Sequence, residues 1–315
     1  MFNFRRYPLK AAAIVTCIIV TTFSSAQTVQ NFQFSVQSQL VEVYLTVTNG
    51  KQLIPHLKAS DFKVTEDGMP VSIDRLDNQD VPLQIVLMCD ISESIRESLK
   101  AIQDAAAAFV ESMNPEDRVT LILFNSAIRV FPQKTDDRRL ILSEIRNAQA
   151  GGITKLYDSL LMGMKYLDGK PGRKAIVCFT DGQDTSGTSS RIAVLNAAAR
   201  YGYPIYTIGA GAGLELSSLK IILRDFAEVN GGRVLFIESI RKLREAFAEI
   251  RAELRSAYVL NYYTHIPSDG RWHDLNVTTV GPALEVHSRK GFFATTMAAT
   301  DPPENKAPVA EQKNP

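Results

Sequence analysis

The 315-residue chain is poor in cysteine, histidine and tryptophan and carries almost no net charge. It has three cysteines, four histidines and one tryptophan, and its formal net charge is +1 at pH 7. A near-neutral chain creates no global field of the kind that draws proteins onto nucleic acid or acidic membranes. The histidines lack any spacing typical of metal ligands, and the sequence offers no Ser-His-Asp or Cys-His arrangement. We therefore expect no nucleic-acid partner and no nucleophilic hydrolase.

Long apolar runs are also rare, and the one near the start of the chain is short. A basic segment (residues 5–10) precedes an apolar stretch (residues 11–22), and small residues at 24–26 precede an expected cut at Gln27. This order is typical of a secretory signal peptide. A membrane span needs about 20 apolar residues, so no stable membrane span is expected after cleavage. We predict a signal peptide over residues 1–26 and an exported protein, periplasmic or secreted.

Two cysteines remain after that cleavage, Cys89 and Cys178, and each lies inside an apolar run. Such positions favour buried thiols that pack as small hydrophobic side chains. An exported protein meets an oxidising environment, so a bridge between the two cysteines is the alternative.

The pattern on both sides of the chain's middle part is that of β-strands. In residues 27–80, apolar residues at 41, 43, 45 and 47 alternate with polar ones before the turn Asn49-Gly50. Residues 256–294 show the same alternation between turns. Neither flank has enough strands for a stable sheet of its own. We expect both flanks to pair into one small β-sandwich, followed by a disordered tail over residues 295–315, where proline and charged residues are frequent.

Between these flanks, residues 81–255 alternate between buried strands and helices with an apolar stripe. The order predicts parallel strands joined by right-handed crossovers, and so an α/β fold with a doubly wound, mostly parallel, Rossmann-like sheet. In this prediction the α/β part is inserted between the two β flanks.

The first strand of this middle part ends in a group of oxygen-bearing side chains. The apolar run over residues 83–89 leads directly into Asp90, and Ser92 and Ser94 follow at alternate positions. In extended backbone, residues two apart point the same way, so one carboxylate and two hydroxyls would converge. Oxygen ligands of this kind suit a hard divalent cation such as Mg²⁺.

Two later residues complete this set. Asp181 follows the buried strand at residues 174–180, and Thr154 follows Gly151-Gly152 just before a helical pattern. Ligands of an open α/β sheet bind beyond the carboxyl ends of its strands, where the strand order reverses. We therefore expect Asp90, Ser92, Ser94, Thr154 and Asp181 to face one crevice.

These motifs resemble the metal-ion-dependent adhesion site of von Willebrand factor type A (VWA) domains, and all five positions match. With its β-rich flanks, the chain resembles the VWFA-related family of exported bacterial proteins. The resemblance implies that the three hydroxyls bind Mg²⁺ (or Mn²⁺ or Ca²⁺), whereas Asp90 and Asp181 act mainly through water. It also implies that Thr154 binds most directly in the liganded state.

A metal held largely by neutral oxygens stays electrophilic, and an open octahedral position accepts a carboxylate. We expect a non-enzymatic adhesion module that binds an acidic group on a protein partner. One alternative is a metal-assisted hydrolase, with Glu93 or Asp184 as general base. Another is an assembly or stress-response partner in the cell envelope. For single residues, the alternatives are a helix cap at Asp90 or Thr154, and at Asp184 a loop cap rather than a ligand.

Overall fold

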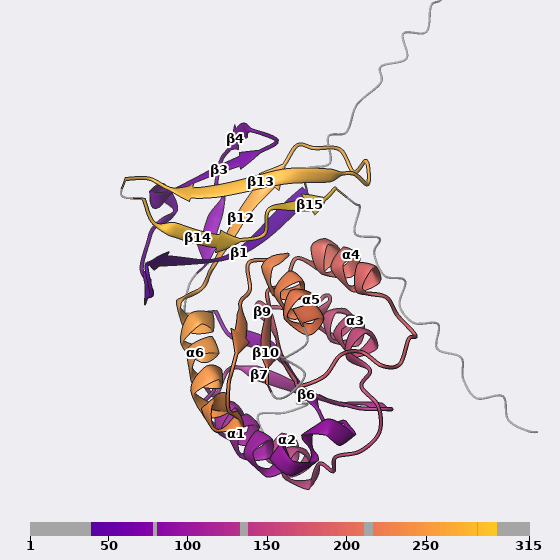
Figure 1. Cartoon of the computed structure of the whole chain (residues 1–315). Helices are drawn as coiled ribbons and strands as arrows, with labels where there is room; N and C mark the ends of the chain where they lie inside the picture. Colours follow the sequence, from indigo (N-terminus) through magenta and orange to yellow (C-terminus); the bar gives the residue numbers. More distant parts are fainter. Residues whose placement is uncertain (1–38, 78–80, 133–137, 211–216, 282, 295–315) are drawn as a thin grey trace, which may run out of the picture. The chain divides into compact units, whose positions relative to one another are not determined.

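The structure, a computed structural model, describes residues 39–77, 81–132, 138–210, 217–281 and 283–294. Within them the chain forms one mostly parallel sheet flanked by helices, and two antiparallel sheets built from the flanking segments (Figure 1). The expected signal peptide and C-terminal tail lie outside the described residues.

The mostly parallel sheet has the strand order β11-β10-β9-β6-β7-β8. The bounds are β6 Leu83–Asp90, β7 Arg118–Phe124, β8 Ile128–Pro132, β9 Arg173–Thr180, β10 Ile205–Gly209 and β11 Val234–Phe236. Neighbouring strands are parallel, except that β7 and β8 are antiparallel. The chain runs outward from β6 to β8 and then crosses back to β9. The strand order therefore reverses between β6 and β9.

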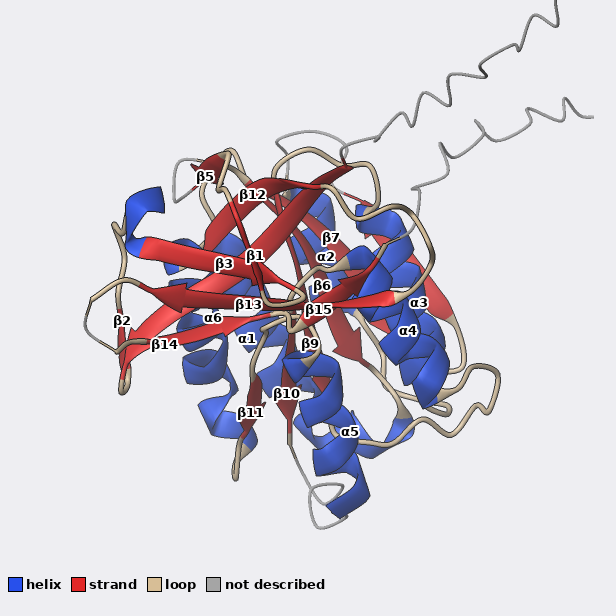
Figure 2. Ribbon diagram, turned by 90° about the horizontal axis from the view of Figure 1, so that it is seen from above, coloured by secondary structure: helices blue, strands red, loops and turns tan. Residues whose placement is uncertain are grey.

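Helices cover both faces of this sheet. Their bounds are α1 Leu99–Glu111, α2 Arg139–Asn147, α3 Leu156–Leu167, α4 Arg191–Tyr201, α5 Ser217–Glu228 and α6 Leu243–Ser256. The helices α1, α2 and α6 pack on one face, and α3, α4 and α5 pack on the other (Figure 2). Each contributes an apolar stripe at helical spacing, as α1 does with Ile102, Phe109 and Val110.

The central strands are apolar on both sides because alternate side chains serve the two faces. In β6, Leu87 packs into the core under α1, and Met88 packs into the core under α3. The same alternation places Cys89 and Cys178 in different cores, and both are buried free thiols. The prediction of buried thiols is confirmed. The alternative of a bridge is wrong, because the sheet lies between the two sulfur atoms.

The flanking segments form two antiparallel sheets with the orders β14-β1-β12-β5, where β2 pairs with β1, and β15-β13-β3-β4. The bounds are β1 Gln39–Asn49, β2 Gln52–Leu53, β3 Phe62–Glu66, β4 Met69–Val71, β5 Arg75–Asp77, β12 Tyr258–Thr264, β13 Trp272–Thr279, β14 Glu285–Ser288 and β15 Gly291–Phe293.

Strands from the two flanks pair with each other, β1 with β12 and β3 with β13. The inner faces of the two sheets share one core, to which Val43, Leu260 and Phe292 belong. The predicted fold class is confirmed: a doubly wound α/β part stands between two β segments that together form a sandwich. The domain boundaries near residues 80 and 255 stay predictions.

Candidate metal centre

The five predicted metal-binding residues lie at the carboxyl ends of β6 and β9 or in the loops beside them. At this point the strand order reverses, so the loops that follow the two strands diverge and leave a crevice. Asp90 is the last residue of β6, and Asp181 directly follows β9. Because the two strands pair in parallel, with Cys89 opposite Phe179, they deliver both carboxylates to the same edge.

Asp90 is fully buried at the floor of this crevice. Its Oδ1 accepts a hydrogen bond from the backbone N–H of Ser92 at 2.8 Å, and its Oδ2 accepts one from Thr180 Oγ1 at 2.6 Å. The first bond closes a local turn from side chain to backbone, which bends the chain out of the strand. The second bond joins β6 to the neighbouring strand β9. Asp90 is therefore a carboxylate fixed from two sides.

Ser92, Ser94 and Asp181 form a continuous row of oxygen atoms. Ser94 Oγ donates to Asp181 Oδ1 at 2.7 Å, and the hydroxyls of Ser92 and Ser94 are 3.1 Å apart. The chain does not stay extended here, because a 3₁₀ helix begins at Glu93. The expectation of extended backbone through residue 94 is therefore wrong, although the two hydroxyls still meet.

Thr154 reaches the same place from the loop between α2 and α3. A methyl group built on Gly182 would lie 3.5 Å from Thr154 Oγ1 and 4.0 Å from Ser94 Oγ, so all three positions adjoin. The Thr154 backbone is held by Thr185. Thr154 N–H donates to Thr185 Oγ1 at 3.0 Å, and Thr185 N–H donates to the Thr154 carbonyl at 2.9 Å. The fold thus brings all five predicted residues together.

Backbone hydrogen bonds hold the loops of this edge to one another. Gly151 N–H donates to the Ile91 carbonyl at 2.9 Å, and Glu93 N–H donates to the Gly152 carbonyl at 3.0 Å. The side-chain amide of Asn125, which follows β7, donates to the Gly151 carbonyl at 2.7 Å. The position of Thr154 relative to the serines is therefore fixed by direct bonds between loops.

Gly152 is the tightest point of this arrangement. Its φ of +79° is a left-handed conformation that glycine adopts without strain. A Cβ atom at this position would lie 2.3 Å from Ser126 Oγ. The same hydroxyl accepts a hydrogen bond from Ile153 N–H at 3.1 Å. Glycine is thus required where the loop turns toward Thr154.

The two carboxylates lie in an unfavourable environment for negative charge. Burial raises the pKa of Asp90 to about 6, although hydrogen bonds from Thr180 and Ser92 oppose the shift, and the charge on Asp181 adds to it. Burial also raises the pKa of Asp181, against the hydrogen bond from Ser94. Among the described residues, no lysine, arginine or histidine pairs with either carboxylate. The centre therefore lacks a compensating positive charge from these residues.

Hydrogen bonds and helix bounds decide the alternatives for Asp184 and Thr154. Asp184 Oδ2 accepts from Tyr157 N–H at 2.9 Å, and its Oδ1 accepts from Ser186 N–H at 3.1 Å. Asp184 therefore caps its own loop and the first turn of α3, as the loop-cap prediction stated. The N-cap of α3 is Lys155, so the alternative that Thr154 caps this helix is wrong.

Thr180 is a residue of the site that the sequence analysis missed. Its hydroxyl is fully buried, donates to Asp90 and accepts from Gly182 N–H at 3.2 Å. The available signal was a threonine at the end of an otherwise apolar buried strand, directly before Asp181. Nowhere in the described part of the chain do three or more carboxylate, imidazole or thiol groups gather in a metal-binding cluster. Hydroxyls would thus be needed to complete a cation's ligand set.

Comparisons with known proteins agree on the α/β part. Residues 85–183 match the family model described as the von Willebrand factor type A domain. A solved von Willebrand factor type A protein from Catenulispora acidiphila is 13% identical, with a TM-score of 0.50 over 79% of this chain and 75% of that chain.

Proximal thread matrix protein 1 from the mussel byssus, solved with a zinc-occupied MIDAS motif, is 18% identical, with a TM-score of 0.50 over 60% of this chain. The match spans 50% of that protein in this structure and 47% in another crystal form. At such identities the likeness concerns the fold. No curated protein matches the chain. Among the described helices, none combines the length and apolar character required to cross a bilayer.

Proposed function

Since this chain is a von Willebrand factor type A domain protein, we propose that the centre at β6 and β9 binds Mg²⁺ and, through it, an acidic group of a protein partner. Asp90, Ser92, Ser94, Thr154 and Asp181 are the proposed ligand set, with Mn²⁺ or Ca²⁺ as alternative ions. The observation that carries this proposal is the convergence of these oxygen atoms, of which Ser94 Oγ and Asp181 Oδ1 are 2.7 Å apart.

The chemistry of the residues fits a divalent cation. Two carboxylates share the crevice, burial raises the pKa of both, and no basic residue of the described chain neutralises them. A buried charge needs a partner, and a cation at this edge would supply it. Magnesium prefers oxygen ligands and keeps part of its coordination for water or a bound group. Hydroxyl and carboxylate oxygens are the only side-chain donors that the five proposed ligands contribute.

The proposed partner supplies a carboxylate to the metal. Three of the five proposed ligands are neutral hydroxyls, so the ion would retain enough positive charge to attract a further anion. The solved mussel protein with a zinc-occupied MIDAS motif supports metal occupancy of this fold in at least one relative. Binding would then depend on the metal and select an acidic side chain of the partner. The module would act without catalysis.

The contacts of the two candidate bases disfavour the hydrolase alternative. Glu93 accepts two hydrogen bonds from Arg96, both at 2.6 Å, and they hold the pKa of this carboxyl below its usual range. Asp184 is occupied by backbone N–H groups of its own loop and of α3. A carboxylate with a lowered pKa, or one whose oxygens are already bonded, is a poor general base at neutral pH.

We further propose that the protein is exported by the predicted signal peptide and acts in the periplasm or outside the cell, as a member of the VWFA-related family. The sandwich would serve as the platform of the binding module. Assembly or stress-response work in the envelope is a version of the same activity with a different partner.

The test is a pull-down of envelope proteins with immobilised mature protein, in Mg²⁺ and in chelator. We expect partners that are retained in Mg²⁺, released by chelator, and lost with Thr154→Val. The matched control is Thr188→Val, which removes a hydroxyl from an exposed threonine of a neighbouring loop. Retention that is equal in chelator, or equal for Thr154→Val and wild type, would refute a metal-mediated contact.

A further inference from the structure

A histidine of the sandwich lies between two aspartates. His273 is the second residue of β13 and pairs with Phe292 of the neighbouring strand β15 (Figure 1). Its Nδ1 lies 2.7 Å from Asp67 Oδ2, and its Nε2 lies 3.2 Å from Asp269 Oδ1. Asp67 belongs to the turn between β3 and β4, and Asp269 belongs to the connection between β12 and β13. One imidazole ring thus joins two turns that are far apart in the sequence.

The two ring nitrogens therefore both face a carboxylate, which accepts hydrogen bonds and donates none when it is ionised. A neutral imidazole has one N–H donor and one lone pair, whereas an imidazolium has two donors. A neutral ring would direct its lone pair at one of the two carboxylates, so this position is complementary to the charged ring. The hydrogen bond to Asp67, supported by the one to Asp269, raises the pKa of His273 above its usual value of 6.5, against the effect of burial.

The two turns differ in how their own hydrogen bonds hold them. Asp67 Oδ1 accepts a hydrogen bond from Asp274 N–H at 2.9 Å, and Asp67 N–H donates to the Asp274 carbonyl at 2.9 Å. Asp269 Oδ1 accepts from Arg271 N–H, inside its own turn, at 2.8 Å. Asp67 is therefore tied to β13 with or without the imidazole, whereas His273 is the residue of β13 that Asp269 binds.

The turn that carries Asp269 (residues 267–271, the Asp269 turn) also binds the residue that follows β15. Gly270 N–H donates to the Ala294 carbonyl at 2.8 Å, and Ala294 N–H donates to the Arg271 carbonyl at 3.0 Å. Ala294 is fully buried and belongs to the sandwich core. The position of the Asp269 turn is therefore coupled to the end of β15.

The other charged groups around the imidazole have partners of their own. Arg271 is exposed and approaches Asp269 Oδ2 at 3.8 Å. Glu66, the last residue of β3, is buried and accepts hydrogen bonds from two hydroxyl groups, each at 2.9 Å. The guanidinium of Arg289 lies 5.6 Å from the centre of the Phe292 ring. Among the described residues, the two aspartates are thus the only charged groups at hydrogen-bond distance from the imidazole.

We propose that His273 is a pH-sensitive switch: its imidazolium holds the Asp269 turn on β13, and loss of the Nε2 proton to solvent releases this turn. The neutral ring keeps the shorter bond, to Asp67, and directs its lone pair at Asp269. The stabilisation by the charged ring is fully present below the usual pKa of 6.5 and is lost as the pH rises through the raised pKa. The turn is therefore held in acidic surroundings and released in alkaline ones.

The chain's single tryptophan, Trp272, directly precedes His273 and reports on this part of the sandwich. Its indole Nε1 donates to Asp274 Oδ1 at 2.9 Å, and its ring centre lies 5.3 Å from that of Phe293. A pH titration of the tryptophan fluorescence of the mature protein therefore follows the switch. We expect one step whose midpoint lies above 6.5, the usual pKa of histidine.

Four variants assign this step. His273→Gln should remove it. Asp67→Asn should lower the midpoint more than Asp269→Asn does, because the bond to Asp67 is the larger cause of the raised pKa. The matched control is His265→Gln, which removes an exposed histidine from the same connection between β12 and β13 and should leave the midpoint in place. A midpoint at or below 6.5, or one that Asp67→Asn does not lower, would overturn the proposal.

Release of the turn is tested on the wild-type protein by backbone order parameters from NMR relaxation, measured on both sides of the midpoint. We expect the order parameters of residues 268–271 to fall above the midpoint and those of residues 67–68 to stay level, because Asp67 keeps its backbone bonds to β13. Order parameters of residues 268–271 that are equal on both sides would show that the turn stays closed and would overturn the proposal. The outcome is independent of Mg²⁺ binding at β6 and β9.

Discussion

The two ends of the central sheet place buried charges of opposite sign on neighbouring strands. At the carboxyl end, Asp90 of β6 is fully buried and hydrogen-bonded by hydroxyl and amide groups. At the amino end, Arg173 of β9 is buried and hydrogen-bonded by carbonyl groups. Neither has a side-chain counter-ion among the described residues.

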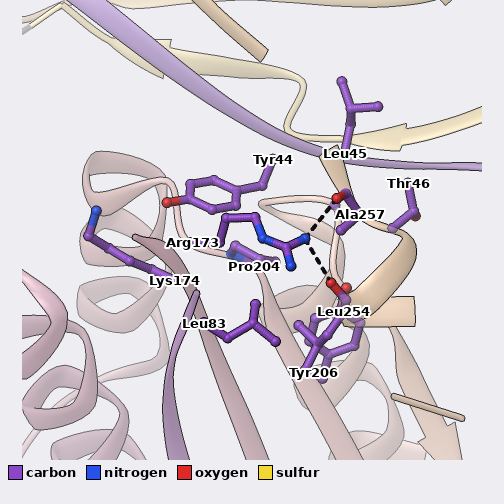
Figure 3. Close-up of a pocket in the computed structure, with 11 residues that line it drawn as sticks. Tyr44, Leu45, Thr46, Leu83, Arg173, Lys174, Pro204, Tyr206, Leu254 and Ala257 are labelled. Carbon is purple, nitrogen blue, oxygen red and sulfur yellow. Dashed lines mark hydrogen bonds between the residues drawn. The ribbon is translucent and has the colours of Figure 1, made fainter. Parts of the chain in front are cut away.

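The difference between the ends lies in what surrounds each charge. Asp90 is accompanied by a second carboxylate and three hydroxyls on loops at the sheet's edge. This edge could therefore share a bound cation with a partner from outside. Arg173 is surrounded by backbone from the two connections to the sandwich. Its hydrogen bonds therefore hold the α/β part and these connections together (Figure 3). One sheet thus provides a recognition edge at the carboxyl ends of its strands, around Asp90, and a joining edge at their amino ends, around Arg173. A buried charge identifies a function only together with the groups that face it.

The largest effect is expected at the joining edge. Arg173→Met should lower the free energy of unfolding by about 2–4 kcal/mol, because three buried carbonyls lose a charged donor. Mg²⁺ affinity should stay unchanged, since the metal edge is at the other end of the strands. Urea denaturation and Mg²⁺ titration of the same preparation measure both quantities. A parallel loss of Mg²⁺ affinity would show that the two edges are coupled.

At the recognition edge, Asp90→Asn should stabilise the metal-free protein at pH 7.5 by about 3 kcal/mol. The folded-state pKa of Asp90, about 6, exceeds the usual value of 3.8. Its ionisation therefore removes stability as the pH rises through this window. Urea denaturation should show a gain for the variant at pH 7.5, little gain at pH 4, and a smaller gain when Mg²⁺ stabilises the wild type. A variant that is less stable than wild type at pH 7.5 without metal would contradict this electrostatic account.

A smaller effect is expected from the loop that carries Thr154. Gly152→Ala should cost about 1–2 kcal/mol, because its φ is positive and its Cβ would meet Ser126. It should also weaken Mg²⁺ binding by moving Thr154. Gly151→Ala is the matched control, since a Cβ there meets its nearest neighbour, Glu93 Oε2, at 3.7 Å. Equal Mg²⁺ affinities for the two variants in calorimetry would show that the loop does not position the site.

Sequence patterns were sufficient for the recognition edge and insufficient for the joining edge. The apolar runs before Asp90 and Asp181 predicted two buried strands. The rules for α/β sheets then placed the carboxyl ends of both strands at the same crevice. Thr180 was not predicted as a site residue because a single threonine in a strand forms no motif with a distinctive spacing. The role of Arg173 could not be predicted for a stronger reason. Its partners are the backbone carbonyls of residues 81, 254 and 257, and every residue has such a carbonyl, so residue types do not identify them. The paired flanks were predictable only because neither could form a sheet alone.

The smallest effect is expected at Glu93, whose exposed carboxylate pairs with Arg96 beside the metal edge. Glu93→Gln should leave Mg²⁺ affinity and the melting temperature nearly unchanged, because exposed ion pairs contribute little. The variant also separates binding from catalysis. If phosphoester or peptide hydrolysis by the wild type were detected in Mg²⁺ and abolished by Glu93→Gln, the hydrolase alternative would replace the adhesion proposal.

The most direct test of the recognition edge is isothermal titration of Mg²⁺ into the mature wild-type protein and into Asp90→Asn at pH 7.5. The arrangement of two carboxylates and three hydroxyls predicts one site in the wild type. It predicts that the variant loses affinity by at least the 10–100-fold typical when an outer partner of a metal ligand is removed. Equal affinity in the two proteins, or no binding to the wild type, would contradict a cation site at the ends of β6 and β9.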